Sequence, residues 1–250
     1  MRAGPAAPRR AVAAAAAAAL LAACGGGAEV PPRLLEGSRP VSFRTDDGVR
    51  LAGRLFGEGR TGVVLAHMLP ADQSSWFPFA RELAQRGYLV LTFDFRGYCP
   101  GGDAGCSEGE REIAEIWRDV EAAVAFLRAR GASRVALVGA SMGGTASLVA
   151  ASHLGEAVAA VVALSAPVEI EGLAAERDVL AGVVAPTLLV AGERDGTAAE
   201  AAEALGAGVA GPARVEILPG GEHGTELLRG ELAGRVRALL LEHLERYAAP

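Results

Sequence analysis

The chain has 250 residues, a formal net charge of -6 and 51% hydrophobic residues. This length and composition suit one α/β domain and exclude a chain that is disordered throughout. No basic run follows the first ten residues, and no apolar run reaches the about 18 residues that a spanning helix needs. We therefore expect neither nucleic acid as a partner nor a transmembrane helix.

The N-terminal segment has the pattern of an export signal. Arg2, Arg9 and Arg10 precede an uncharged, Ala-rich run over residues 11–23. A basic start followed by a short apolar run is typical of a signal peptide, and this run is too short to cross a membrane. We expect residues 1–23 to be removed on export.

The end of that segment carries a second signal. The sequence Leu-Ala-Ala-Cys-Gly at 21–25 resembles the lipobox of bacterial lipoproteins, in which the Cys is acylated and becomes the new N-terminus. The resemblance implies that Cys24 is lipidated and that the protein is anchored by lipid in the bacterial cell envelope. An ordinary signal peptide cut nearby, or a twin-arginine signal, is the alternative. Residues 24–39 are rich in Gly and Pro and predict a flexible tether before a domain over 40–250.

The elements of that domain can be predicted in chain order. Apolar or alternating runs predict strands at 41–44, 50–56, 62–67, 88–94, 134–139, 158–164, 186–191 and 214–218. Helical spacing and stop signals predict helices at 71–86, 110–130, 142–153, 198–205 and 226–247.

This order of elements determines the fold class. The first two strands flank Asp46-Asp47-Gly48, which is a hairpin signal. Strands and helices then alternate, so we expect an α/β fold with one mostly parallel sheet and helices on both faces. Only about 20 residues separate the strands ending at 164 and starting at 186, which leaves room for one short helix but for no large cap.

A possible nucleophile lies between the strand at 134–139 and the helix at 142–153. Residues 139–143 read Gly-Ala-Ser-Met-Gly, a G-x-S-x-G sequence. A strained strand-to-helix turn with small neighbours exposes its serine at the end of the strand, so this context favours Ser141 as a nucleophile. The alternative is a Gly-rich turn with an idle serine.

A base and an orienting acid follow in the order expected for such a serine. Asp195 lies in the loop after the strand at 186–191, and His223 lies in the loop after the strand at 214–218. The carboxyl ends of parallel strands share one edge of a sheet, so Ser141, Asp195 and His223 are expected to meet there. The alternatives are Glu193 or Glu222 for the acid and His67 or His153 for the base.

At this point the chain resembles the α/β-hydrolases over about residues 40–248, with the dienelactone-hydrolase-like and small esterase branch as the nearest. Dienelactone hydrolases use a Cys nucleophile, whereas this chain has Ser141. The segment Leu-Ala-His-Met-Leu-Pro at 65–70 resembles the family's His-Gly-x segment, with Met68 in place of Gly. The resemblance implies an oxyanion hole formed by the N–H groups of Leu69 and Met142, with Met68 N–H as the other candidate at the first position. His67 would hold that loop and would not be the base.

The loop after the strand at 88–94 has two further features. Asp94-Phe-Arg-Gly resembles the family's D-x-R-G turn, which implies that Asp94 and Arg96 brace the loop by pairing. Relatives have a shorter turn here, and this chain carries an insertion bracketed by Cys99 and Cys106. With Cys24 lipidated, two cysteines remain in an oxidising compartment, so we expect a Cys99–Cys106 disulfide near the active site; two free thiols are the alternative.

Together these features predict a serine hydrolase that cleaves small carboxylic esters through an acyl-enzyme. Amidases, peptidases, thioesterases and acyltransferases use the same machinery. A non-catalytic envelope protein that binds ligands with this fold is the alternative from another class. We expect no cofactor and no metal, because there is no H-E-x-x-H motif and the three cysteines are scattered.

Overall fold

The computed structural model describes Met1 and residues 31–100 and 103–250. Residues 2–23 of the expected signal segment, the expected lipidation site Cys24 and residues 25–30 of the expected tether lie outside the described residues. The folded part begins earlier than residue 40, because a 3₁₀ turn, η1, covers Pro32–Leu34 and the first strand starts at Ser38. Leu34 and Leu35 pack against the core, which explains why this end of the expected tether is ordered.

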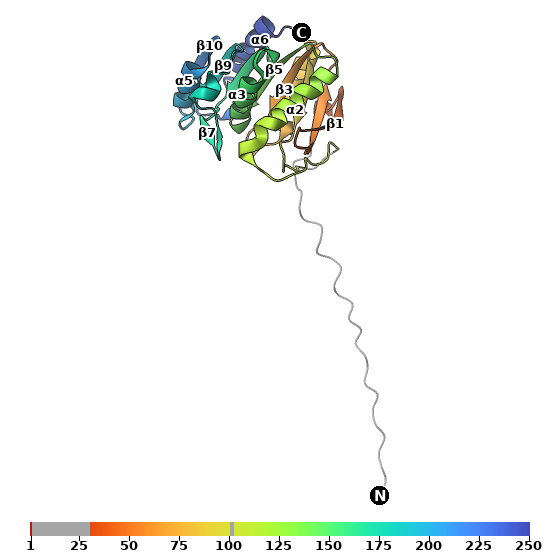
Figure 1. Cartoon of the computed structure of the whole chain (residues 1–250). Coiled ribbons are helices and arrows are strands. Elements are labelled where there is room, and N and C mark those ends of the chain that lie inside the picture. Colours follow the sequence, from red (N-terminus) through yellow and green to blue (C-terminus); the bar gives the residue numbers. More distant parts are fainter. Residues whose placement is uncertain (2–30, 101–102) are drawn as a thin grey trace.

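One eight-stranded sheet forms the centre of the domain (Figure 1). In spatial order its strands are β1 (Ser38–Arg44), β2 (Arg50–Phe56), β4 (Leu89–Phe93), β3 (Thr61–Ala66), β5 (Arg134–Ala140), β6 (Ala160–Leu164), β9 (Thr187–Gly192) and β10 (Ala213–Leu218). Strand β2 is antiparallel to both of its neighbours, and all other pairs are parallel. The expected mostly parallel sheet is confirmed.

The hairpin between β1 and β2 turns where the sequence predicts it. Gly48 has φ 89°, a conformation that side chains with a Cβ rarely adopt. The turn is closed by a hydrogen bond from the N–H of Thr45 to the carbonyl of Val49 at 3.0 Å. It fixes the register in which Arg44 faces Arg50.

Helices cover both faces of the sheet, and two clusters of buried side chains hold them there. The helices α2 (Ile116–Ala129), α3 (Met142–Leu154) and α5 (Ala198–Gly208) pack on one face and lie in front of the sheet in Figure 1. The helices α1 (Phe77–Gln85) and α6 (Ala233–Tyr247) pack on the other. Strand residues alternate between the two clusters, as the two-residue period of a strand requires: in β5, Leu137 faces the first and Val138 the second.

Three of the predicted helices begin later than expected. A 3₁₀ turn, η2 (Gln73–Trp76), precedes α1, because Pro78 has no N–H to continue a helix through this point. A turn η3 (Ile113–Glu115) precedes α2. The helix expected at 226–247 is divided into η5 (Gly224–Leu228) and α6, with Gly230 between them.

Among residues 31–100 and 103–250, no large cap covers the sheet. After β6 the chain forms a small hairpin, β7 (Glu169–Ile170) and β8 (Leu173–Ala174), and one turn of helix, α4 (Arg177–Leu180). A further 3₁₀ turn, η4 (Gly155–Ala157), follows α3. Within the described part of the chain, no helix is long and apolar enough to cross a membrane.

Candidate active site

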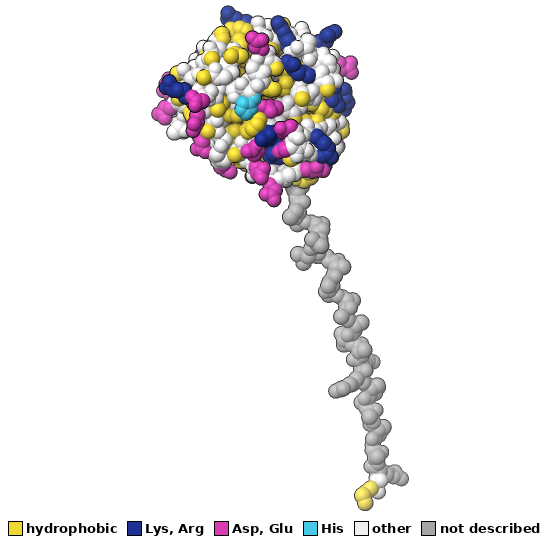
Figure 2. Space-filling view, in the orientation of Figure 1, with side chains coloured by type: hydrophobic (Ala, Val, Ile, Leu, Met, Phe, Trp, Pro, Cys, Tyr) yellow, Lys and Arg dark blue, Asp and Glu magenta, His cyan; other side chains and the backbone are white. Residues whose placement is uncertain are grey.

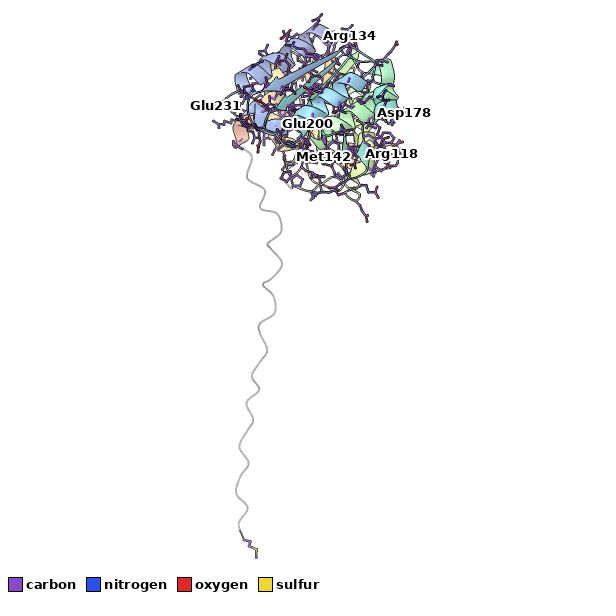
Figure 3. All side chains as sticks on the ribbon, turned by 90° about the vertical axis from the view of Figure 1, so that its left-hand side faces the viewer. Arg118, Arg134, Met142, Asp178, Glu200 and Glu231 are labelled. Atoms are coloured by element: carbon purple, nitrogen blue, oxygen red, sulfur yellow. A yellow bond between two sulfur atoms is a disulfide. The ribbon has the colours of Figure 1, made fainter. Side chains whose placement is uncertain are left out.

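Ser141 lies on a sharp turn between the end of β5 and the start of α3. Its backbone has φ 48° and ψ -121°, which is strained for a residue with a side chain. The glycines around it are required by space, since a Cβ at Gly143 would lie 2.5 Å from the carbonyl oxygens of Ala66 and His67. Figure 3 shows Arg134, at the start of β5, at the upper end of the domain and Met142 toward the lower end. Ser141 is therefore at the carboxyl edge of the sheet.

His223 and Asp195 form a hydrogen-bonded pair at the same edge. The imidazole Nδ1 lies 2.9 Å and 3.0 Å from the two carboxylate oxygens of Asp195. A carboxylate only accepts, so Nδ1 carries the proton and Nε2 of the neutral ring is left as an acceptor. The side chain of His223 is 39% exposed, whereas that of Asp195 is 11% exposed. The Asp195 carboxylate is thus mostly enclosed by the loops, and the His223 ring lies partly exposed at the surface.

The loop that carries His223 packs against the turn that carries Ser141. A Cβ at Gly224 would lie 3.3 Å from the Cβ of Ala140, the residue before Ser141. Among the described residues, no hydrogen bond joins the Ser141 hydroxyl to His223; catalytic hydrogen bonds are often long before substrate binds. The structure therefore joins the expected acid to the expected base and brings their loop to the turn of the expected nucleophile.

Two of the alternatives, His153 for the base and Glu222 for the acid, have other partners. His153 lies at the end of α3, the opposite end from Ser141, and contacts Glu121 at 3.0 Å. Glu222 accepts a hydrogen bond from the N–H of Gly221. Among the described side chains, Asp195 is the carboxylate that contacts the His223 ring.

His67 holds the loop after β3 by two hydrogen bonds. Its Nδ1–H donates to the carbonyl of Met68 at 3.0 Å, and its Nε2 accepts from the N–H of Phe95 at 3.2 Å. Complete burial lowers the pKa of His67 to about 4, so the ring is neutral. A neutral ring with one N–H and one acceptor fits these two bonds and leaves no free nitrogen for acid–base work.

The same contact orients the next peptide group. In a trans peptide the C=O and the N–H point in opposite directions, so fixing the Met68 carbonyl also fixes the N–H of Leu69. Neither Leu69 N–H nor Met142 N–H donates a hydrogen bond to any described residue. Both groups are therefore available to a ligand, as an oxyanion hole needs.

The comparisons with known proteins agree with this architecture. A family model of the α/β-hydrolase fold matches residues 62–185. An esterase from Pyrococcus furiosus superposes with a TM-score of 0.71 at 19% sequence identity, covering 89% of this chain and 95% of the esterase. The chain has an α/β-hydrolase fold. No curated protein matches the chain significantly.

Other solved structures with this hydrolase fold are similar. A dienelactone hydrolase from Anabaena variabilis has a TM-score of 0.69 at 23% identity, covering 84% of this chain and 98% of that one. An esterase from Exiguobacterium antarcticum has a TM-score of 0.66 at 18% identity, covering 83% and 100%. These likenesses concern the fold.

The D-x-R-G turn is braced in a different way from the one expected. Asp94 and Arg96 do not pair with each other. Asp94 accepts from the backbone N–H and the side-chain amide of Gln73, at 2.9 Å and 2.6 Å. Arg96 points to the opposite side of the turn and pairs with Asp119 of α2 at 2.7 Å and with Asp47 of the hairpin at 2.9 Å. The two side chains leave the chain in different directions, so each braces the turn against a separate neighbour.

The predicted disulfide is present and lies beside the site. It joins Cys99 to Cys106, whose Cα atoms are 4.3 Å apart. Tyr98, next to Cys99, donates its hydroxyl to the thioether of Met142 at 3.8 Å, and its ring lies 4.6 Å from that of His67. Asp103 within the loop forms an ion pair with the buried Arg54 of β2. The loop is thus attached to the sheet and to the residue that follows Ser141.

An open cavity of about 760 Å³ lies between the start of α2 and the β7–β8 turn. Most of its lining is charged, and Figure 2 shows acidic and basic side chains gathered on the lower part of this face. Its lining residues are Asp47, Arg111, Glu112, Ile113, Ala114, Glu115, Arg118 and Glu171. Ser141, Asp195 and His223 are not among them.

Sequence reasoning missed one residue that contacts the site. Ser165 follows β6 at the carboxyl edge and accepts a hydrogen bond from the N–H of Gly224 at 3.0 Å. No sequence signal marks it, since its contact depends on a loop 59 positions later.

Across residues 31–100 and 103–250, no group of three or more His, Cys, Asp or Glu side chains is arranged to hold a metal ion.

Proposed function

We propose that this chain is a serine hydrolase that cleaves carboxylic esters through an acyl-enzyme. The observation that carries the proposal is the His223–Asp195 pair, with its loop packed against the strained turn of Ser141. A mostly enclosed carboxylate that fixes the tautomer of a partly exposed imidazole is the arrangement in which a base activates a serine hydroxyl.

In this mechanism Ser141 Oγ attacks the acyl carbon of the ester while His223 Nε2 takes its proton. Asp195 stabilises the imidazolium that forms. The negative oxygen of the tetrahedral intermediate accepts hydrogen bonds from Leu69 N–H and Met142 N–H, each worth about 3–4 kcal/mol when well aimed. His223 then gives its proton to the leaving alcohol. Water, activated by the same ring, hydrolyses the acyl-enzyme and frees Ser141.

The decisive experiment is covalent labelling with a fluorophosphonate probe, followed by mass spectrometry of the labelled peptide. We expect one label, on Ser141, and hydrolysis of nitrophenyl esters that is lost on labelling. Ser147→Ala is a matched control, because Ser147 lies on α3 and donates its hydroxyl to the carbonyl of Gly143 at 2.7 Å. A wild-type protein that takes up no probe and hydrolyses no ester would point to the non-catalytic class.

We further propose that the substrates have short acyl groups. The segment between β6 and β9 adds only a two-strand hairpin and one turn of helix, so little protein is available to enclose a long chain. A series of nitrophenyl esters from acetate upward should show kcat/KM falling as the acyl chain lengthens. A maximum at long chains would contradict this proposal and leave the hydrolase assignment intact.

We also propose that the enzyme acts in the cell envelope, held there by a lipid on Cys24. Two observations support this: the lipobox-like segment and the disulfide between Cys99 and Cys106, which is stable in an oxidising compartment.

A further inference from the structure

The loop that carries His223 has little to fix it from within. Residues 219–224 include three glycines, of which Gly220 has φ 139° and Gly224 has φ 55°. Glycine loses more conformational freedom on ordering than any other residue. The His223 side chain is 39% exposed, so packing of its ring does not determine where the backbone lies. The position of the ring therefore depends on contacts made to the loop by other segments.

The part of the loop before His223 has one side-chain hydrogen bond within it, from the N–H of Gly221 to the Glu222 carboxylate, and a backbone hydrogen bond to a neighbouring loop. The carbonyl of Gly220 accepts from the N–H of Arg194 at 2.7 Å, which joins this loop to the one that carries Asp195.

The part after His223 is held by two side chains. Gly224 N–H donates to Ser165 Oγ at 3.0 Å, and Thr225 N–H lies 3.4 Å from the thioether sulfur of Met68. These N–H groups begin η5, where no helical carbonyl is available to them. The Thr225 hydroxyl also lies 3.7 Å from the same sulfur. Two acceptors from separate strand ends thus bind the two residues that follow His223.

Both acceptors are themselves rigidly held. Ser165 is 2% exposed, and its N–H donates to the carbonyl of Val190 at 2.8 Å. Met68 is 6% exposed and its carbonyl is fixed by His67. A Cβ at Gly224 would overlap the Met68 sulfur, so the two segments are closely packed at this point.

The backbone at Ser165 gives independent support. Its φ is 50°, a conformation that favours glycine, so a serine here carries backbone strain. The hydroxyl provides a contact that glycine could not.

We propose that Ser165 and Met68 are positioning residues, which hold His223 at Ser141 by capping the N–H groups of Gly224 and Thr225. The inference rests on the proposed hydrolase function for its catalytic consequence, but the capping itself does not. Met68 then has two roles. The peptide group between Met68 and Leu69 carries the proposed oxyanion donor, Leu69 N–H. The Met68 side chain joins this loop to the loop that carries His223.

The test uses Ser165→Gly, which removes the hydroxyl and relieves the backbone strain, and Met68→Leu, which keeps size and removes the sulfur acceptor. Glu171→Gly is the matched control, because Glu171 also has a positive φ, 46°, and lies exposed in the β7–β8 turn. Hydrogen exchange of residues 219–228 and the kinetics of a nitrophenyl ester are measured for each. Activity is expressed per site titrated with a fluorophosphonate, so that misfolded protein does not count.

For Ser165→Gly we expect faster exchange in 219–228 and a fall in kcat of about 10-fold to 100-fold with KM nearly unchanged. Met68→Leu should act in the same direction, and the double variant should lose less than the two effects combined, because both caps hold one loop. Glu171→Gly should change neither readout. Should Ser165→Gly fail to fold, Met68→Leu and Thr225→Val give the same comparison.

Unchanged exchange in 219–228 for Ser165→Gly and Met68→Leu would overturn the capping. Faster exchange with kcat unchanged would overturn the positioning role. A wild-type protein without hydrolase activity would instead refute the proposed function, while the exchange data would still decide whether the two side chains hold the loop.

Discussion

His67 donates from Nδ1 to the carbonyl of Met68 at 3.0 Å and thereby fixes the peptide whose N–H belongs to Leu69. The contact makes the buried ring part of the loop that is proposed to supply an oxyanion donor, although the ring has no nitrogen free to act on a substrate. The Cβ of Met68 restricts this loop, and the His67 contact orients the donor in spite of it.

Replacement of His67 by Phe should test this role. The variant keeps a ring beside Phe95 and Tyr98 but loses both hydrogen bonds. We expect kcat for ester hydrolysis to fall by about 10-fold to 100-fold, because one oxyanion donor is no longer aimed. The pH profile between 5 and 8 should keep its shape, since burial holds the pKa of His67 at about 4. His243→Phe, at a buried histidine of α6, controls for general loss of stability. A shifted pH profile in His67→Phe would mean that His67 titrates in catalysis.

The proposed triad of Ser141, His223 and Asp195 should respond as a unit. Ser141→Ala and His223→Ala should each lower kcat by about 10⁴-fold to 10⁶-fold, and the double variant should be no worse than either single one. Asp195→Asn should cost about 10⁴-fold, because the amide favours the wrong tautomer of the ring. Steady-state kinetics with a nitrophenyl ester measure these effects. Substantial activity in His223→Ala would reopen the choice of base, and full activity in Asp195→Asn would direct attention to Glu193 or Glu222.

The parts of the site that follow from parallel strands could be predicted from the sequence. Each loop that leaves the carboxyl end of a strand reaches the same edge, so the order of Ser141, Asp195 and His223 was enough to predict that Asp195 and His223 meet. The disulfide could be predicted because, with Cys24 expected to carry a lipid, Cys99 and Cys106 are the two cysteines that remain for an oxidising compartment.

Contacts between distant segments could not be predicted in this way. Arg96 is bound by Asp119, which is 23 positions away on α2, and no local pattern distinguishes that carboxylate from the others nearby. Ser165 contributes through a backbone conformation and a contact that exist only after the loops pack. Helix α1 begins later than the sequence predicts, because the helical backbone hydrogen bonds cannot continue through Pro78, which has no N–H.

The Cys99–Cys106 disulfide should stabilise the domain without taking part in catalysis. Replacing both cysteines by Ser removes a bridge that closes a loop of eight residues, which is worth about 2.5 kcal/mol on the chain-entropy estimate. We expect a lower Tm and unchanged fluorophosphonate labelling of Ser141. Thermal unfolding with and without reductant measures the first, and the reduced wild type should match the double variant. A Tm that does not change would show that the Arg54–Asp103 ion pair and packing hold the loop without the bridge.

Cys24 should determine whether the protein stays with the membrane. The mature wild type should enter the detergent phase on partitioning, and its N-terminal peptide should carry the mass of attached acyl chains. Cys24→Ser should be found in the aqueous phase or remain uncleaved, whereas Gly27→Ser should behave as wild type. A wild-type protein in the aqueous phase with an N-terminus other than residue 24 would exclude lipidation.

Asp94 should give the domain a stability that falls as pH rises. Burial raises the pKa of this carboxyl from 3.8 to about 7. Between these pH values the folded protein binds a proton that the unfolded chain releases. The contribution of Asp94 to the free energy of unfolding is therefore complete below pH 4 and is lost as pH rises through 7. Asp94→Asn removes the titration. The free energy of unfolding of the variant, minus that of the wild type, should therefore increase from pH 4 to pH 7 by up to about 4 kcal/mol.

His67 contributes the opposite slope, because its pKa is lowered by burial, but it does so in both proteins and cancels in the difference. Urea unfolding at several pH values measures the two curves, and a difference that stays constant with pH would show that Asp94 is ionised in the folded state throughout this range.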